Sequence, residues 1–155
     1  MKCLLVVHSY HHKNTEKIAK VFSTILDAQI VAPQEVDPSA LQEYDLIGFG
    51  SGIYGAKHHR LILELVDCLP QVHDKKAFIF STSAIISKSK VAKDHSLLRE
   101  MLQSKGYTVL DEFACHGFNT NSFMKYLGGM NKGRPNSEDL DDARKFILTL
   151  KEQFV

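Results

Sequence analysis

The sequence predicts a three-layer α/β fold in which helices cover both faces of a five-stranded parallel sheet. Three observations lead to this prediction: five apolar runs, helical patterns between them, and small or polar residues where the runs end. Runs without apolar–polar alternation are typical of strands buried on both faces, as in a doubly wound sheet. A chain of 155 residues suits one such domain, so we expect a single domain over residues 1–155.

The predicted elements alternate along the chain as a doubly wound sheet requires. The first strand covers residues 3–7, and an amphipathic helix follows it, beginning at Asn14 or Thr15, which are both good helix caps. We expect the other strands at residues 29–31, 45–50, 76–80 and 107–115, and the other helices at 57–68, 91–105 and 137–153. Right-handed crossovers then favour the spatial strand order 2-1-3-4-5.

The composition argues against several classes of protein. Lysine and arginine total 19 and aspartate and glutamate 18, and the resulting net charge of +1 argues against a nucleic-acid partner. No stretch approaches the roughly 20 apolar residues of a membrane span, and no charged-then-apolar leader precedes the first strand. The cysteines Cys3, Cys68 and Cys115 are widely spaced and odd in number. We therefore expect reduced thiols and a cytoplasmic protein, whereas the oligomeric state is left unpredicted.

Three loops at the carboxyl ends of strands are expected to meet at one edge of the sheet, where ligands of such folds bind. The first loop, residues 8–15, precedes a helix whose free N–H groups and partial positive charge favour a phosphate. The candidate phosphate-binding residues are Ser9, His11, His12, Lys13, Asn14 and Thr15. Small polar side chains of this kind also form turns and helix caps, so the loop taken alone supports both interpretations.

The second and third loops contain residues that can contact a planar ligand. The candidate residues of the second loop are Ser51, Gly52, Ile53, Tyr54 and Gly55, and those of the third are Ser81, Thr82, Ser83 and Ala84. Glycine permits close approach of the backbone to a ring, and Tyr54 offers an aromatic face. The small residues of the third loop suit hydrogen bonds to the edge of a heterocycle. A surface tyrosine in a turn and an ordinary strand-end turn are the structural alternatives.

Other kinds of site fit the sequence less well. The first loop lacks the spacing of a nucleotide-triphosphate loop and contains no glycine of a dinucleotide fingerprint. The doublets His11–His12 and His58–His59 invite a metal interpretation, but adjacent side chains diverge and no metal-ligand motif accompanies them. A phospho-acceptor receiver would need carboxylates after the first and third strands. A low-molecular-weight phosphatase would need a cysteine at the start of the phosphate loop.

With these residues assembled, the chain resembles the flavodoxin family along its whole length. Members carry a phosphate loop after the first strand, in which hydroxyl residues flank a glycine and a threonine closes the pattern. Here Ser9 stands at the start and residues 12–15 at the end, with His12 in place of a hydroxyl residue and Lys13 in place of the glycine. Residues 51–55 are similar to the family's first flavin loop and to a stretch of flavodoxin-like protoporphyrinogen oxidases. Residues 81–86 resemble the second flavin loop.

The resemblance implies a flavodoxin-like fold, FMN as cofactor, and electron transfer between redox partner proteins or to a small-molecule acceptor. It implies that the first loop holds the phosphate and that Tyr54 lies near the flavin ring. The chain has no tryptophan, so Ile85 or Ile86 would cover the other face of the ring, or that face would be open. An FMN-dependent oxidoreductase of the quinone or protoporphyrinogen type is one alternative to the electron carrier. A flavin-free interaction domain of the same fold is the other.

Overall fold

The apolar runs of the sequence form the parallel strands of one central sheet. The structure is a computed structural model, and it describes residues 1–9, 13–117 and 131–154. The parallel strands are β1 (Cys3–His8), β2 (Gln29–Val31), β3 (Leu46–Tyr54), β5 (Lys75–Ser83) and β6 (Tyr107–His116). Their spatial order is β2-β1-β3-β5-β6. The predicted order is confirmed, because the number β4 belongs to an additional short strand (Lys57–His58) that pairs antiparallel with β3.

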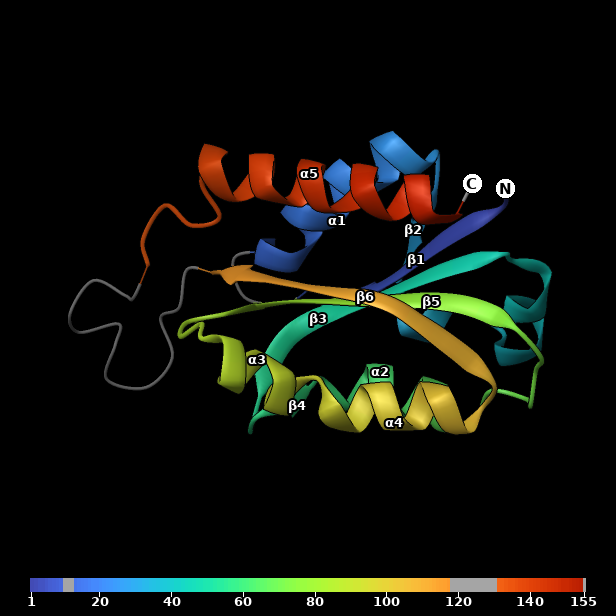
Figure 1. Ribbon diagram of the computed structural model, residues 1–155. Helices are drawn as coiled ribbons and strands as arrows, with labels where there is room; N and C mark the ends of the chain where they lie inside the picture. Colours follow the sequence, from blue (N-terminus) through green and yellow to red (C-terminus); the bar gives the residue numbers. More distant parts are fainter. Residues whose placement is uncertain (10–12, 118–130, 155) are drawn as a thin grey trace.

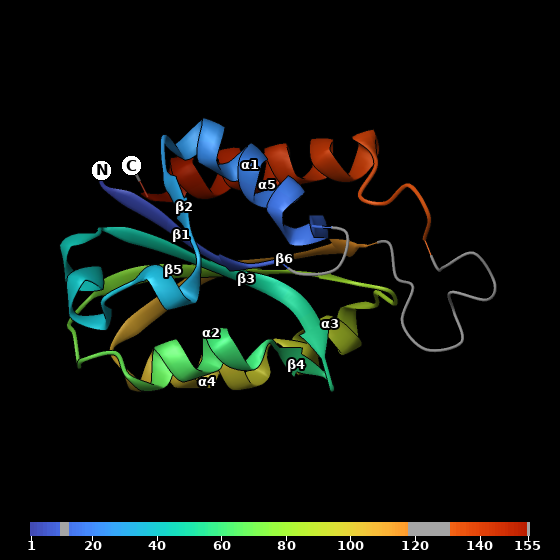
Figure 2. The same ribbon diagram turned by 180° about the vertical axis from the view of Figure 1, so that it is seen from behind.

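Two layers of helices enclose the sheet (Figures 1 and 2). One face is covered by α1 (Asn14–Leu26) and α5 (Ser137–Phe154). The other face is covered by α2 (Arg60–Asp67), α3 (Lys88–Asp94) and α4 (Ser96–Ser104). Two 3-10 helices, η2 (Pro33–Glu35) and η3 (Pro38–Glu43), connect β2 to β3. Among the described helices, none combines the length and the apolar character that a membrane crossing requires.

Apolar residues that alternate along the strands fill two cores, one on each face of the sheet. The core beneath α1 and α5 includes Leu5, Phe22, Phe78, Phe80 and Ile147. The core beneath α2 and α4 includes Val6, Phe49, Ile62, Ile79 and Leu98. Neighbouring residues of a strand point to opposite faces, which is why Leu5 and Val6 of β1 serve different cores. A strand that serves both cores has no polar face, as its unbroken apolar run predicts.

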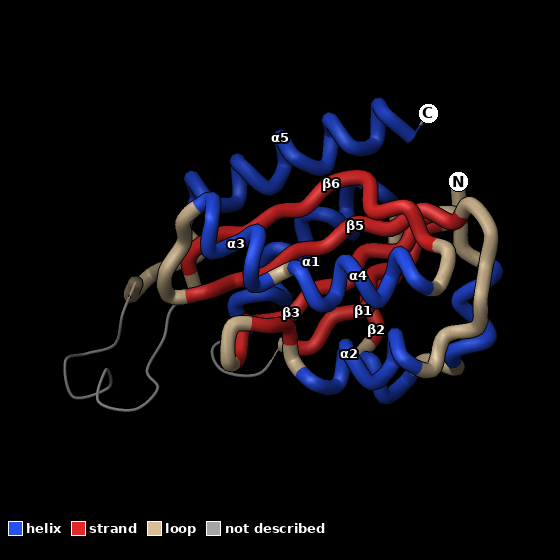
Figure 3. Tube along the Cα trace, turned by 60° about the horizontal axis from the view of Figure 1, so that its bottom comes forward, coloured by secondary structure: helices blue, strands red, loops and turns tan. Residues whose placement is uncertain are grey.

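Both central strands extend beyond their predicted ends, and this corrects the local structure of two predicted loops. Residues 51–54 continue β3 and residues 81–83 continue β5, so they are strand residues rather than loop residues (Figure 3). Their glycines and hydroxyl residues are typical of loops. Pairing between the two strands, in which Ser51 lies opposite Ser81, supplies the backbone hydrogen bonds that keep this polar stretch extended.

Two predicted helices differ from the observed ones on the α2–α4 face. The helix expected at residues 57–68 begins only at Arg60, because its first residues form β4. The helix expected at 91–105 is divided into α3 and α4 at His95, which ends one helix and precedes the other. The His95 side chain is fully buried. The apolar pattern predicts one helix here, because a histidine whose side chain is buried at the junction carries no signal of its own.

Candidate cofactor-binding site

The first segment of the candidate site lies where β1 ends and α1 begins. Lys13 is the N-cap residue of α1, while Asn14 and Thr15 are its first helical residues. The predicted start of the helix at Asn14 is confirmed, but its cap is Lys13 and not Asn14 or Thr15. The Ser9 hydroxyl accepts a hydrogen bond from the backbone N–H of Glu16 at 3.2 Å. This contact satisfies one of the donors that a helix N-terminus leaves open.

Lys13 adopts the left-handed conformation, with φ 51° and ψ 37°. It stands where the flavodoxin pattern has glycine, the residue that reaches positive φ most readily. A non-glycine residue there costs about 1 kcal/mol or more. The chain thus keeps the backbone shape of the pattern while placing a cation at the start of α1, with Lys13 Nζ 4.0 Å from Glu16 Oε2.

Two hydroxyls join this segment to the end of β5. Thr15 Oγ1 and Thr82 Oγ1 lie 2.9 Å apart, and both residues are buried. The chain just beyond β6 also comes close, because a Cβ atom added at Gly117 would lie 2.7 Å from Asn14 Nδ2. The carboxyl ends of β5 and β6 therefore meet the N-terminus of α1, as the doubly wound arrangement predicts.

The second predicted loop is a hairpin between β3 and β4. Gly55 and Ala56 form its two-residue turn and have φ values of 57° and 61°, which is typical of a type I′ turn. The Tyr54 ring meets the His59 ring edge-on, with centroids 5.0 Å apart. His59 in turn stacks on His8 at the end of β1, with centroids 3.9 Å apart. The two histidines therefore place Tyr54 beside the first segment.

The third predicted segment is held between α3 and β6. Lys90 of α3 donates a hydrogen bond from Nζ to Ser83 Oγ at 3.4 Å. Beyond β5, the Ala84 carbonyl oxygen lies 3.2 Å from His116 Nδ1 and accepts a hydrogen bond from Asn131 Nδ2 at 2.6 Å. Neighbours on two sides thus fix the position of the backbone that follows Thr82.

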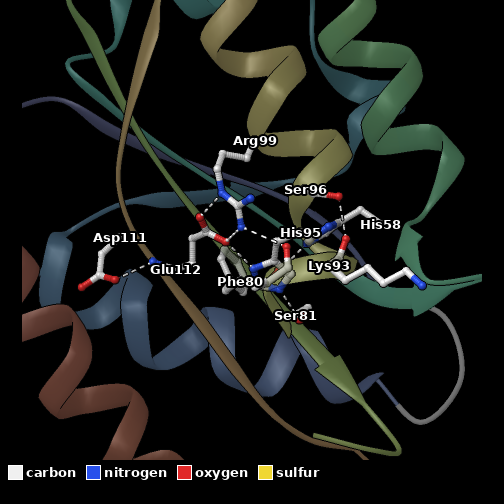
Figure 4. Close-up of polar contacts among 10 residues, drawn as sticks. His58, Phe80, Ser81, Lys93, His95, Ser96, Arg99, Asp111 and Glu112 are labelled. Carbon is white, nitrogen blue, oxygen red and sulfur yellow. Dashed lines mark hydrogen bonds and ion pairs between the residues drawn. The ribbon is translucent and has the colours of Figure 1, made fainter. Parts of the chain in front are cut away.

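A buried polar network that the sequence analysis did not predict supports the end of β5 (Figure 4). Ser81 Oγ lies 2.7 Å from His95 Nε2, and His95 Nδ1 lies 2.9 Å from Glu112 Oε1. Arg99 donates to both Glu112 oxygens, at 2.5 and 2.8 Å. Burial raises the pKa of Glu112, but hydrogen bonds from Arg99 and His95 outweigh burial and lower this pKa to about 2. Glu112 is therefore ionised at neutral pH, and His95 Nδ1 donates to it.

A bulge in β6 turns Glu112 toward this network. Ala77 pairs with Val109, but Ile79 pairs with Glu112, so β6 contains one extra residue between the two pairs. The Asp111 carboxylate accepts a hydrogen bond from the backbone N–H of Glu112 at 2.8 Å. Without the extra residue, Asp111 would face α4 in place of Glu112. An acidic pair inside a predicted strand is the sequence signal from which this network could have been suspected.

The order serine, histidine, glutamate matches the hydrogen-bond pattern of a hydrolase triad. A nucleophilic serine must reach a substrate carbonyl, however, and Ser81 is 2% exposed while His95 is fully buried. The network instead connects β5, β6 and α4 beneath the candidate site. Its role is to fix where β5 ends, and hence where Thr82 and Ser83 lie.

A second buried histidine lies against the network. His58 Nε2 donates to the Phe80 carbonyl at 3.1 Å, and its ring centroid is 4.9 Å from that of His95. Burial, and then the neighbouring His95, lower the pKa of His58 to about 3. His58 is therefore neutral at pH 7, with Nδ1 as a buried acceptor. The described part of the chain offers no hydrogen-bond partner for this atom.

The histidine doublets do not assemble a metal site in the part of the chain that can be described. His58 bonds to the backbone of β5 while His59 stacks on His8, so the two rings of this doublet diverge. His11 and His12, both predicted to bind phosphate, lie outside the described residues. Among the residues that the structure describes, no group of three His, Cys, Asp or Glu side chains is placed to hold a metal ion.

The donors gathered at this edge fit a phosphate ester attached to a planar group. The hydroxyls of Ser9 and Thr15, the N–H groups that begin α1 and the Lys13 cation supply hydrogen bonds and positive charge. Burial lowers the pKa values of both His8 and His59, so their stacked rings are uncharged at neutral pH. Together with Tyr54 they present an uncharged aromatic surface next to the polar one.

Comparison with known proteins agrees with this geometry. The family model described as "Flavodoxin domain" matches residues 5–146. The chain is 46% identical over 151 residues to Uncharacterized protein MJ0298 of Methanocaldococcus jannaschii, covering 97% of this chain and 98% of that protein. Flavodoxin 2 of Bacillus cereus superposes with a TM-score of 0.75 at 18% identity, over 99% of both chains.

A flavodoxin of Fusobacterium nucleatum, solved bound to flavin mononucleotide, superposes with a TM-score of 0.68 at 12% identity, over 100% of both chains. At such identities the solved structures establish the shared fold alone. The match to the family model extends from β1 into α5 and is the evidence for assigning the chain to a family. The chain belongs to the flavodoxin family.

Proposed function

We propose that this protein binds FMN at the carboxyl edge of the sheet and carries electrons between redox partners. Membership of the flavodoxin family supports FMN as the cofactor, and one solved relative is a flavodoxin bound to it. The observation that carries the proposal is the buried contact between Thr15 and Thr82 at the N-terminus of α1, beside the hairpin that bears Tyr54. When bound, FMN supplies one- and two-electron transfer, which the side chains at this edge do not provide.

The chain's own residues bind and orient the cofactor in this proposal. The phosphate is held by the first segment, comprising Ser9, His11, His12, Lys13, Asn14 and Thr15. The flavin ring lies between the second segment, Ser51, Gly52, Ile53, Tyr54 and Gly55, and the third, Ser81, Thr82, Ser83 and Ala84. The buried hydroxyls of Ser51 and Ser81 bond within the protein and support these segments from beneath. Lys13 and the helix N-terminus favour the phosphate by charge, while Tyr54 favours the ring by stacking.

The burial of the polar groups nearest to β5 favours a carrier over an enzyme. General acid–base catalysis needs a side chain that reaches the substrate. His58 and His95 are at most 1% exposed, and each is bonded within the protein. A carrier needs only a bound flavin that partners can approach. We therefore expect no steady-state turnover with NAD(P)H and quinones, whereas turnover would indicate an FMN-dependent oxidoreductase.

Removal of one hydroxyl tests the placement of the phosphate. Thr15→Val keeps the shape of the side chain but removes Oγ1, so FMN affinity should fall about tenfold or more, as expected for losing a hydrogen bond to a charged group. Riboflavin lacks the phosphate, so its affinity should change much less. Flavin fluorescence titration measures both dissociation constants.

Thr24→Val is the matched control, because Thr24 lies on the same helix at an exposed position, where its hydroxyl donates to the Lys20 carbonyl at 3.0 Å. It should leave both affinities within about twofold. Equal losses of FMN and riboflavin in Thr15→Val would show that the phosphate lies elsewhere. A protein that takes up neither flavin would contradict the proposed function and favour an interaction domain.

A further inference from the structure

We propose that the surface formed by β4, the first residue of α2, and α3 is the docking site for a redox partner with an acidic face. This inference rests on the proposed function, because it names the partner that would exchange electrons at the same site. The surface is called the basic patch and consists of Lys57, Arg60, Lys88, Lys90 and Lys93.

The basic patch borders the candidate site on two sides. Lys57 begins β4, directly after the hairpin turn that follows Tyr54. Lys88 begins α3, five residues after Ser83 ends β5. β4 and α3 lie side by side, although they are 30 residues apart in the sequence (Figures 1 and 2). Lys90 reaches Ser83 Oγ at 3.4 Å, so the patch is continuous with the site.

Carboxylates neutralise only part of this charge. Residues 57–64 and 88–94 contain the five cations of the patch and only two acidic residues, Glu64 and Asp94. Asp94 is buried and pairs with Lys90, and Glu64 pairs with Arg60 at 3.2 Å. Lys57, Lys88 and Lys93 are exposed. The whole chain carries only +1, so the patch concentrates positive charge beside the site while the rest of the molecule is slightly negative.

An exposed apolar residue lies in the segment that joins β5 to α3. Ile85 is 56% exposed and is placed between Ser83 and α3. Exposed lysines on two neighbouring elements, together with an exposed isoleucine that precedes one of them, suit a protein partner more than a small anion. Opposite charge accelerates the encounter of two proteins by roughly ten- to a thousandfold at low salt, and a small apolar contact is desolvated on docking. An acidic partner therefore approaches the edge of the flavin directly.

Two forms of one electron acceptor test this proposal. Native cytochrome c is basic and succinylated cytochrome c is acidic, while both contain the same haem. The FMN-loaded protein is reduced photochemically and mixed with each ferric cytochrome in a stopped-flow instrument. One electron passes from the reduced flavin to each haem iron, which becomes ferrous. The acidic cytochrome should be reduced about tenfold faster than the basic one at low ionic strength, and the two rates should converge in high salt.

A pair of charge-reversed variants locates the effect. Lys88→Glu/Lys93→Glu changes the basic patch, and Lys20→Glu/Lys145→Glu makes the same change of charge at exposed positions of α1 and α5, on the other face. The patch variant should reduce the acidic cytochrome about tenfold more slowly and keep its FMN. The control should change the rate less than about threefold.

The outcomes separate this inference from the proposed function. If the two variants slow the reaction equally, or if the unmodified protein reduces basic cytochrome c faster, the patch is not the docking site although FMN binding stands. A protein that binds no FMN overturns both proposals. A shortage of bound FMN in the patch variant alone would show that these lysines serve the cofactor and not the partner.

Discussion

The two faces of the sheet are both buried, yet different interactions hold them together. Beneath α1 and α5, five phenylalanine rings pack with centroids 5.0 to 6.1 Å apart, and they belong to Phe22, Phe78, Phe80, Phe113 and Phe146. Beneath α2, α3 and α4, the mainly aliphatic core is replaced near the candidate site by the polar residues His58, Ser81, His95 and Glu112. Apolar packing is the main interaction on the face covered by α1 and α5. On the other face, hydrogen bonds fix the positions of the side chains near the candidate site.

The difference shows how the two faces of β5 have separate roles: one stabilises the strand, and the other fixes the position of its carboxyl end. Phenyl rings stabilise β5 through the area they bury, which is favourable but tolerant of small shifts. A satisfied polar network costs desolvation but permits one geometry only. Ser81 belongs to this network, and the next residue, Thr82, meets α1 on the opposite face. The apolar face therefore holds the strand, and the polar face sets where its carboxyl end lies.

The largest expected effect lies on the apolar face. Phe22 touches four other rings, and Phe22→Ala should lower the free energy of unfolding by about 3–5 kcal/mol. Because the cavity it leaves is lined by phenyl rings, the loss should be the same at pH 7 and pH 5. Urea unfolding followed by circular dichroism measures it. Phe22→Leu, the control, should lower the free energy of unfolding by less. A loss in Phe22→Ala that depends on pH would contradict the view that apolar packing alone holds this face together.

An intermediate effect is expected at the ion pair of the polar face. Glu112→Gln removes the charge that Arg99 and His95 bind, and should lower the free energy of unfolding by roughly 2–4 kcal/mol at pH 7. The pKa of Glu112 is depressed to about 2, so its stabilisation is complete above about pH 4.5 and is lost as the pH falls toward 2. The difference in the free energy of unfolding between variant and wild type should therefore decrease as the pH falls from about 4.5 toward 2.

Glu100→Gln is the matched control for this variant, because Glu100 lies exposed on α4, one residue after Arg99. Its free energy of unfolding should stay within about 0.5 kcal/mol of the wild type, as is usual for surface substitutions. A Glu112→Gln variant as stable as this control at pH 7 would mean that the network does not stabilise the fold.

Most of the fold was predictable because its signals are local. Apolar runs located the five parallel strands, and the apolar stripes between them located the helices on both faces. The ends of β3 and β5 were placed too early, since residues 51–54 and 81–83 are extended by pairing between strands and not by their own composition. Pairing of this kind depends on a neighbour that is distant in the sequence.

The candidate site was predictable only where it follows from topology. The loops after β1, β3 and β5 were expected to meet, and Thr15 does reach Thr82 across 67 residues of sequence. The polar network was missed because it needs a register shift in β6 that selects Glu112 over Asp111. No periodicity marks such a shift. The basic patch was missed for a similar reason, because its lysines come from two segments that only folding places side by side.

The smallest expected effect is a change in pH dependence at His58. The pKa of His58 is about 3 in the folded protein against an ordinary value near 6.5, so the unfolded chain binds a proton that the folded chain excludes. The free energy of unfolding therefore falls as the pH drops below 6.5, by about 2 kcal/mol at pH 5 from this group. His58→Gln keeps a donor for the Phe80 carbonyl but does not titrate, so its loss between pH 7 and pH 5 should be smaller than that of the wild type by this amount. Equal losses in urea unfolding would show that His58 is protonated within the fold, and between pH 7 and pH 5 the polar face would then respond to acid no more than the phenylalanine face does.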